Sequence, residues 1–151
     1  MAKRVLFLYT GNSARSQMAK AFLRYYAADE FEAYSAGPEP KGIHPLAVQV
    51  MQEIGLDLSD QYSESVTEVL GKMHFDYLVT ICSDAYERCP SVFPGVGQRL
   101  HWAFEDPAAF AGSGGARLDK FRQVRDRIDK KIRAWLEAQG LVVPPRQSAE
   151  G

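Results

Sequence analysis

A loop rich in hydrogen-bond donors follows a hydrophobic run near the start of the chain, in the segment VLFLYTGNSARSQMA. Gly11 permits backbone conformations that are closed to other residues, and the first N–H groups of a helix lack partners within it. The guanidinium of Arg15 presents a fork that matches two oxygens of a tetrahedral anion. Donors, helix dipole and guanidinium would converge on one oxyanion. The pattern predicts an anion-binding loop made of Gly11, Asn12, Ser13, Ala14, Arg15 and Ser16.

Two further observations concern the kind of loop this is and the residue that precedes it. It is not a Walker-type nucleotide loop, because no Gly-Lys-Ser/Thr follows at the required spacing. The alternative is an ordinary strand-to-helix turn with a surface arginine, and the sequence G-N-S-x-R after a hydrophobic strand favours the anion loop over it. Tyr9 occupies the end of the strand, where the chemistry of such a pocket would want a small nucleophile.

Two cysteines and an aspartate could supply the remaining chemistry. Cys82 and Cys89 lie seven residues apart in CSDAYERC, directly after a hydrophobic run. The alternative reading is two buried cysteines that act as small hydrophobes. Asp106 precedes Pro107 in HWAFEDP, beside Glu105, and an Asp-Pro pair often simply forms a turn. The three histidines show no metal-ligand spacing, so no metal site is predicted.

These residues need a scaffold, and the hydrophobic pattern predicts an α/β fold. Continuous hydrophobic runs indicate buried strands at residues 4–9, 31–37, 76–82 and 99–104. Apolar residues at helical spacing indicate helices at residues 16–28, 45–54 and 118–136. Such alternation favours a parallel sheet with helices on both faces, which binds ligands at the carboxyl ends of its strands. Residues 9–16 and 82–90 both fall at strand ends of this kind and are therefore expected at the same edge.

Composition narrows the function classes. The chain of 151 residues has a net charge of −1, which gives no support for nucleic acid or an anionic membrane as a partner. No apolar run approaches the ~18 residues of a membrane span. We expect a single domain over residues 1–140, a flexible tail over residues 141–151, a monomer, and a cytoplasmic location in which both cysteines are reduced at rest.

Taken together, the motifs resemble those of the thioredoxin-coupled arsenate reductases, which share the low-molecular-weight protein tyrosine phosphatase fold. The resemblance covers residues 3 to 138 and rests on VLFLYTGNSARSQMAKAFLR, SAG, HPLAVQVMQEIGLDLSDQ, VTICSDAYERCP and HWAFEDP. It implies a three-layer fold with a four-stranded parallel sheet, an arsenate- or phosphate-like substrate, and thioredoxin as external reductant. It also implies a nucleophilic cysteine at the position of Tyr9.

Tyrosine at this position changes the expected chemistry. A thiolate among N–H donors and beside arginine has a lowered pKa and attacks arsenic or phosphorus directly. A phenol, with an unperturbed pKa near ~10, cannot take part in thiol–disulfide exchange. The ring must also fill the anion site or rotate out of it. We therefore expect a plugged or distorted loop and loss of arsenate reduction. A phosphatase that uses Tyr9 as an oxygen nucleophile is a further alternative.

The resemblance assigns roles to the other groups. It implies that Cys82 attacks the oxidised nucleophile, that Cys89 attacks Cys82, and that thioredoxin reduces the resulting disulfide. On an unbroken helix the two Cα atoms would be ~10.5 Å apart, whereas a disulfide needs roughly 7 Å or less, so closure would require unwinding. The resemblance also implies that Asp106 is the general acid that protonates the leaving oxygen, with Glu105 as the weaker candidate; a turn-forming Asp-Pro pair is the alternative. The residues that follow, AAF, weaken the phosphotyrosine phosphatase reading.

Some members of the resembled family hold a potassium ion near the loop. The matching positions here are Asn12, Ser35 and Glu64, but Lys20 stands where an acidic residue is common. An ammonium could replace the ion, so little potassium dependence is expected; alternatively, Lys20 is a solvated helix residue. Two function classes remain: an arsenate reductase by lineage that is disabled at its nucleophile, and a non-enzymatic module that binds an oxyanion or a partner.

Overall fold

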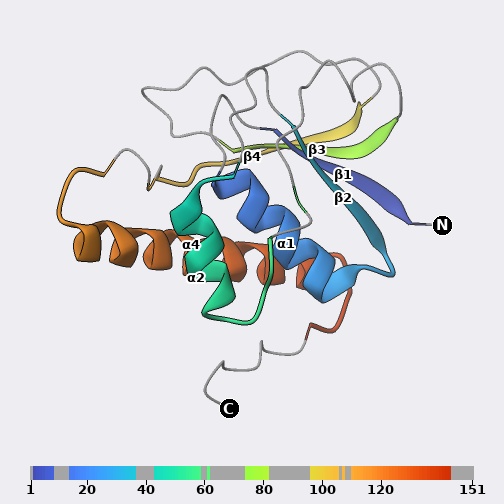
Figure 1. Ribbon diagram of the computed structural model, residues 1–151. Coiled ribbons are helices and arrows are strands. Elements are labelled where there is room, and N and C mark those ends of the chain that lie inside the picture. The colour runs from blue at the N-terminus through green and yellow to red at the C-terminus, as the bar shows by residue number, and fades with distance from the viewer. Residues whose placement is uncertain are drawn as a thin grey trace.

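The computed structural model describes residues 2–8, 14–36, 43–58, 61, 74–81, 96–105, 107 and 110–143. Within them lie seven helices and strands in the order β1 α1 β2 α2 β3 β4 α4 (Figure 1). The strands are β1 Lys3–Leu8, β2 Phe31–Ala36, β3 Phe75–Ile81 and β4 Val96–Trp102. The helices are α1 Arg15–Ala27, α2 Pro45–Gln52 and α4 Gly114–Ala138.

The strands form one parallel sheet in the order β2-β1-β3-β4. Leu8 lies beside Ala36 of β2 and Thr80 of β3, and Ile81 lies beside Trp102 of β4. The carboxyl ends of the four strands therefore meet at one edge of the sheet, which confirms the predicted four-stranded parallel architecture.

All three described helices cover the same face of the sheet (Figure 1). Val5 and Phe7 of β1 point into this helix layer and belong to the main hydrophobic core. Leu6 and Leu8, on alternate positions of the strand, join a second cluster and are fully buried, so the opposite face is covered as well. None of the three described helices lies on that face. Helices on both faces therefore stay a prediction for that side.

Local sequence explains where the helices begin and end. His44 accepts a hydrogen bond from the backbone of Leu46 at 3.1 Å, and Pro45 fits the first turn of α2. Gly55, just beyond α2, has φ +80°, a conformation that side-chain-bearing residues rarely adopt. The side chain of Ser113 caps α4 by accepting from Ala116 at 3.2 Å.

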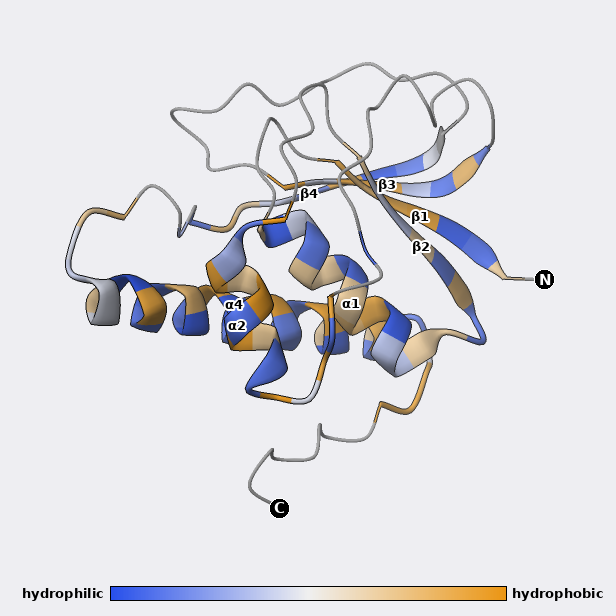
Figure 2. Cartoon of the chain, in the orientation of Figure 1, coloured by the Kyte–Doolittle hydropathy of each residue, from blue (hydrophilic) through white to orange (hydrophobic). Residues whose placement is uncertain are grey.

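Helix α4 is longer than the predicted range of residues 118–136, because its first turn, GGAR, carries no apolar period. Figure 2 shows hydrophobic and hydrophilic residues alternating along α4, as expected of an amphipathic helix. No helix in the described part of the chain combines the length and hydrophobicity needed to cross a membrane.

A group of charged side chains joins α2 to α4; we call Glu53, Arg122 and Arg125 the α2–α4 ion network. Arg125, only 8% exposed, donates to the Val50 carbonyl at 2.9 Å and to Glu53 Oε1 at 3.0 Å. Arg122 donates to Glu53 Oε2 at 2.7 Å. Hydrogen bonds from Arg122 lower the pKa of Glu53, and Arg125 acts in the same direction. The network therefore fixes the end of α2 on the long helix.

Candidate oxyanion site

The predicted site lies at the carboxyl edge of the sheet, where the described residues cover part of it. Leu8, the last residue of β1, immediately precedes Tyr9 in the sequence, and Ile81 ends β3 immediately before Cys82. The side-chain positions of several predicted residues fall outside the described ranges, namely Tyr9, Gly11, Asn12, Ser13, Glu64, Cys82, Cys89 and Asp106. The register nevertheless places β1, which leads to Tyr9, beside β3, which leads to Cys82.

Arg15 is the first residue of α1 and is fully buried. Its Nη1 donates to the backbone carbonyl of Phe104 at 2.8 Å, across 89 residues of sequence. The bond joins the start of α1 to the segment that follows β4. A buried guanidinium at a helix N-terminus, beside the strand edge, excludes the alternative of a turn with a surface arginine. It is the feature expected of an anion-binding loop.

Ala14 and Ser16 complete the described part of the predicted loop. Both are buried, Ala14 at 1% and Ser16 at 0% exposure. The hydroxyl of Ser16 has no hydrogen-bond partner among the described residues. A buried hydroxyl without a partner costs free energy, so Ser16 provides an unused donor in the first turn of the helix.

The segment after β4, residues 103–110, is held from two sides; residues 106, 108 and 109 within it lie outside the described ranges. Arg15 of α1 contacts Phe104, as described above. From α4, Lys120 Nζ lies 2.7 Å from Glu105 Oε2 and 5.2 Å from the centre of the Phe110 ring. Glu105 is thus engaged in an ion pair with Lys120 of α4.

The expected cation site can be tested at two residues. Ser35 pairs with Phe7 in the sheet, so its side chain faces the helix layer; it is fully buried, and its hydroxyl lacks a hydrogen-bond partner within the described ranges. An unused buried oxygen fits a cation ligand. Lys20 is only 8% exposed, which rules out the solvated-residue alternative. Asn12 and Glu64, the other two predicted ligands, lie outside the described ranges, so the replacement of potassium by the Lys20 ammonium stays a prediction.

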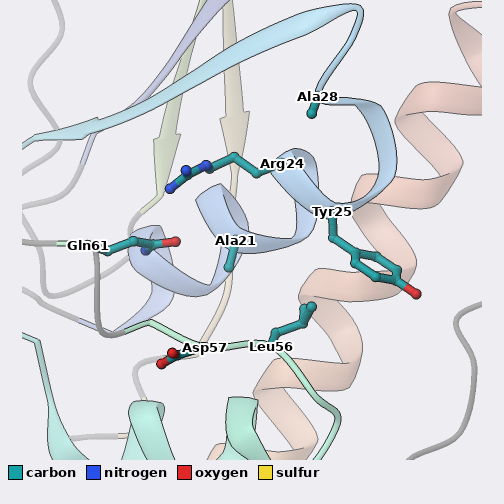
Figure 3. Close-up of a pocket in the computed structure, with 7 residues that line it drawn as sticks. All are labelled: Ala21, Arg24, Tyr25, Ala28, Leu56, Asp57 and Gln61. Atoms are coloured by element: carbon teal, nitrogen blue, oxygen red, sulfur yellow. The ribbon is translucent and has the colours of Figure 1, made fainter.

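A separate cavity of about 320 Å³ opens along the other end of α1 (Figure 3). Figure 3 shows Arg24 extending toward Gln61 while Tyr25 points the opposite way. Gln61 in turn donates to the backbone and side chain of Gln17 on α1, at 3.1 and 2.9 Å. None of the predicted site residues lines this cavity, which is bounded by Ala21, Arg24, Tyr25, Ala28, Leu56, Asp57 and Gln61.

Two contributors to the site were missed by sequence reasoning. The acceptor for Arg15 is a backbone carbonyl, that of Phe104, and carries no side-chain signature. Lys120 is one of several cations on an amphipathic helix, and nothing in the sequence distinguishes it from the others. Only the tertiary arrangement selects these two groups.

The sequence model of the low molecular weight phosphotyrosine protein phosphatases matches residues 4–141. The match spans the four strands, the three described helices and the predicted loop. The chain belongs to the low molecular weight phosphotyrosine protein phosphatase family.

Within that family the arsenate reductases stand out as relatives, in agreement with the resemblance drawn from the motifs. The arsenate reductase of Shouchella clausii is 44% identical over 139 residues, which are 91% of this chain and 98% of that protein. A solved arsenate reductase in the phosphate-binding state has a TM-score of 0.74 at 27% identity, with 90% of this chain and 98% of that one covered. The thioredoxin-dependent arsenate reductase of Corynebacterium glutamicum has a TM-score of 0.65 at 27% identity, with 91% and 61% covered.

Proposed function

We propose that this chain is an arsenate reductase-type protein that keeps the oxyanion loop but does not reduce arsenate, because Tyr9 occupies the nucleophile position. The observation that carries the proposal is Arg15, fully buried at the start of α1 and bonded to the segment that holds Asp106. Relatives named as arsenate reductases, one of them solved in a phosphate-binding state, support the oxyanion class. A cytoplasmic location suits this chemistry because thiols are reduced there.

The proposed lineage chemistry begins with a thiolate in the anion loop. That thiolate attacks the arsenic of arsenate, Asp106 protonates the departing oxygen, and a sulfur–arsenic bond forms. Cys82 then attacks the nucleophile's sulfur, and the electron pair of the sulfur–arsenic bond leaves with arsenic as arsenite. Cys89 attacks Cys82 and frees the first thiol. The two electrons come from the cysteine pair, and thioredoxin, the named reductant of one relative, restores it.

Tyr9 stops this sequence at its first bond. A phenolate oxygen could at most form an ester with arsenic, and arsenic would remain in its oxidised state. Cys82 has no sulfur to attack in such an ester, so no electrons reach arsenic. The size of the tyrosine ring is a second, steric obstacle, because an aromatic side chain that can bury about 150–250 Å² of surface competes with the anion for space.

The test restores sulfur at one position. Tyr9→Cys is expected to reduce arsenate with thioredoxin, thioredoxin reductase and NADPH, while the unmodified chain shows no turnover. Tyr9→Ser is the matched control, because serine relieves the crowding but still offers oxygen; it is expected to stay inactive. Turnover by the unmodified chain, or a well-folded Tyr9→Cys protein without turnover, would overturn the proposal.

A non-enzymatic oxyanion-binding module is the second candidate, and the buried Arg15 favours it too. Calorimetry with inorganic phosphate separates the two readings: tight binding by the unmodified chain, together with an inactive Tyr9→Cys protein, would favour the module. Mass spectrometry after mild oxidation adds a check of the redox pair, because a Cys82–Cys89 disulfide is expected only for the reductase lineage. Hydrolysis of a phosphotyrosine analogue with a phosphorylated Tyr9 would instead point to a phosphatase.

A further inference from the structure

Lys120 contacts the segment after β4 at two points that lie on either side of Asp106 in the sequence. Its ammonium is 2.7 Å from the carboxylate of Glu105, the residue immediately before Asp106. The same ammonium lies 5.2 Å from the centre of the Phe110 ring, within the range of a cation–π contact. One side chain of α4 thus binds the segment before and after the predicted acid.

The segment also contains a backbone hydrogen bond of its own. The backbone N–H of Phe110 donates to the carbonyl of Pro107 at 3.3 Å. Gly112, two residues further on, lies so close to the Phe110 ring that a Cβ there would meet ring carbon Cε1 at 3.1 Å. The Phe110 ring, 36% exposed, thus lies between Gly112 on its own segment and the ammonium of Lys120 on α4.

The charges around the segment come from both helices that face it. Arg15 of α1 binds the Phe104 carbonyl, and Lys120 of α4 binds Glu105. On α4 the neighbouring Asp119 and Arg122 are paired with each other at 2.6 Å. The side chain of Lys120 is 19% exposed, against 50% for Glu105, so the lysine is the anchored partner of the pair.

We propose that Lys120 is a positioning residue for Asp106, which it acts on through Glu105 and Phe110. The inference rests on the proposed role of Asp106 as the general acid. Lys120 does two things in this arrangement. It fixes the backbone on both sides of the acid, and it neutralises the neighbouring carboxylate, whose negative charge would otherwise oppose loss of the Asp106 proton to the leaving oxygen.

Hydrogen exchange on the unmodified chain tests the positioning directly. Lys120→Met is expected to speed amide exchange at residues 104, 105 and 110 by about fivefold to tenfold, since it removes one ion pair and one cation–π contact. Lys120→Arg keeps both contacts and is expected to stay within about twofold of the parent. The matched control is Lys130→Met, which removes an exposed lysine from the same helix. Unchanged exchange in Lys120→Met would overturn the proposal.

Turnover tests the link to Asp106, in the Tyr9→Cys background. Lys120→Met is expected to lower kcat several-fold with little change in KM, and Lys120→Arg to restore it. In an Asp106→Asn background the same Lys120→Met change is expected to have no further effect, because its influence passes through the acid. Equal effects with and without Asp106 would overturn the positioning role. If Tyr9→Cys is inactive, the proposed function fails, while the exchange experiment still decides whether Lys120 holds the segment.

Discussion

Two regions of this molecule use the same chemistry, a cation of one helix bound to an acceptor on another element, with different consequences. In the α2–α4 ion network, Arg122 and Arg125 both bind Glu53 and join two regular helices. Around residues 103–110, Arg15 and Lys120 bind a connecting segment that precedes and follows Asp106. The first arrangement joins two helices, and the second holds a connecting segment at residues on both sides of the proposed acid in the sequence.

The two regions also differ in redundancy. Glu53 receives bonds from two arginines, so the loss of one leaves the other in place. Phe104 and Glu105 each receive their cation from a single side chain in the described structure. A single substitution should therefore disturb the connecting segment more than the helix pair, and this difference can be measured.

The largest effect is expected at Arg15. Arg15→Met leaves the Phe104 carbonyl buried without its donor and removes the guanidinium from the loop, so the free energy of unfolding should fall by about 2–3 kcal/mol. In the Tyr9→Cys background, the same change should abolish phosphate binding. Urea denaturation and calorimetry are the measurements. Arg15→Lys serves as the control that keeps the charge. An unchanged phosphate affinity in Arg15→Met would show that Arg15 does not bind the anion, and would contradict the larger effect expected in this region.

A smaller effect on stability alone is expected at Glu53. Its side chain is 30% exposed, and solvent screening limits the loss in Glu53→Gln to about 1 kcal/mol. Turnover of the Tyr9→Cys protein should be unchanged, since the network joins helix to helix. A drop in turnover without a matching loss of stability would show that the two regions are not separate.

Glu53 also gives the network a pH dependence. Hydrogen bonds from Arg122 hold the folded-state pKa of Glu53 below its ordinary value. A depressed acid contributes stability that is fully present above its unfolded pKa of about 4.3 and is lost as pH falls through the folded value. Stability curves of the parent and Glu53→Gln should therefore converge in acid, and curves that stay parallel between neutral pH and pH 3 would contradict this.

The smallest effect is expected on exchanging potassium for sodium. Because Lys20 is buried in the helix layer, the melting temperature should not change measurably between the two salts. Lys20→Glu supplies the contrast, since a carboxylate offers oxygen ligands to a cation and should introduce a dependence on potassium. A clear shift in the parent chain would show that a cation is bound despite the lysine.

The sequence predicted helices and strands well where their apolar residues follow a regular pattern. The β1 and β3 strands and the α2 helix were found within a residue or two, because their apolar residues are continuous or strictly periodic. The β4 strand was placed at residues 99–104 but spans Val96–Trp102, since its first half, VGQR, is polar for a strand. An edge position in the sheet allows such a sequence.

The site was predictable only in part. The order of residues around Arg15 favoured an anion-binding loop over a turn with a surface arginine, and the burial of Arg15 excludes the surface arginine. Its bond to Phe104 was not foreseeable, since the two are 89 residues apart and the acceptor is backbone. From the sequence, Lys20 could be either a solvated helix residue or an ammonium that replaces the potassium ion, and only its burial in the structure excluded the first possibility.

The pairing of β1 with β3 constrains the order in which the protein can fold. Leu8 and Thr80 are neighbours in the sheet, although most of the first half of the chain separates them. Closing so long a stretch costs entropy before any contact compensates it, which slows folding of parallel sheets. A nascent chain therefore cannot assemble the edge on which Arg15 works until β3 has left the ribosome, so early truncations should neither fold nor capture an anion.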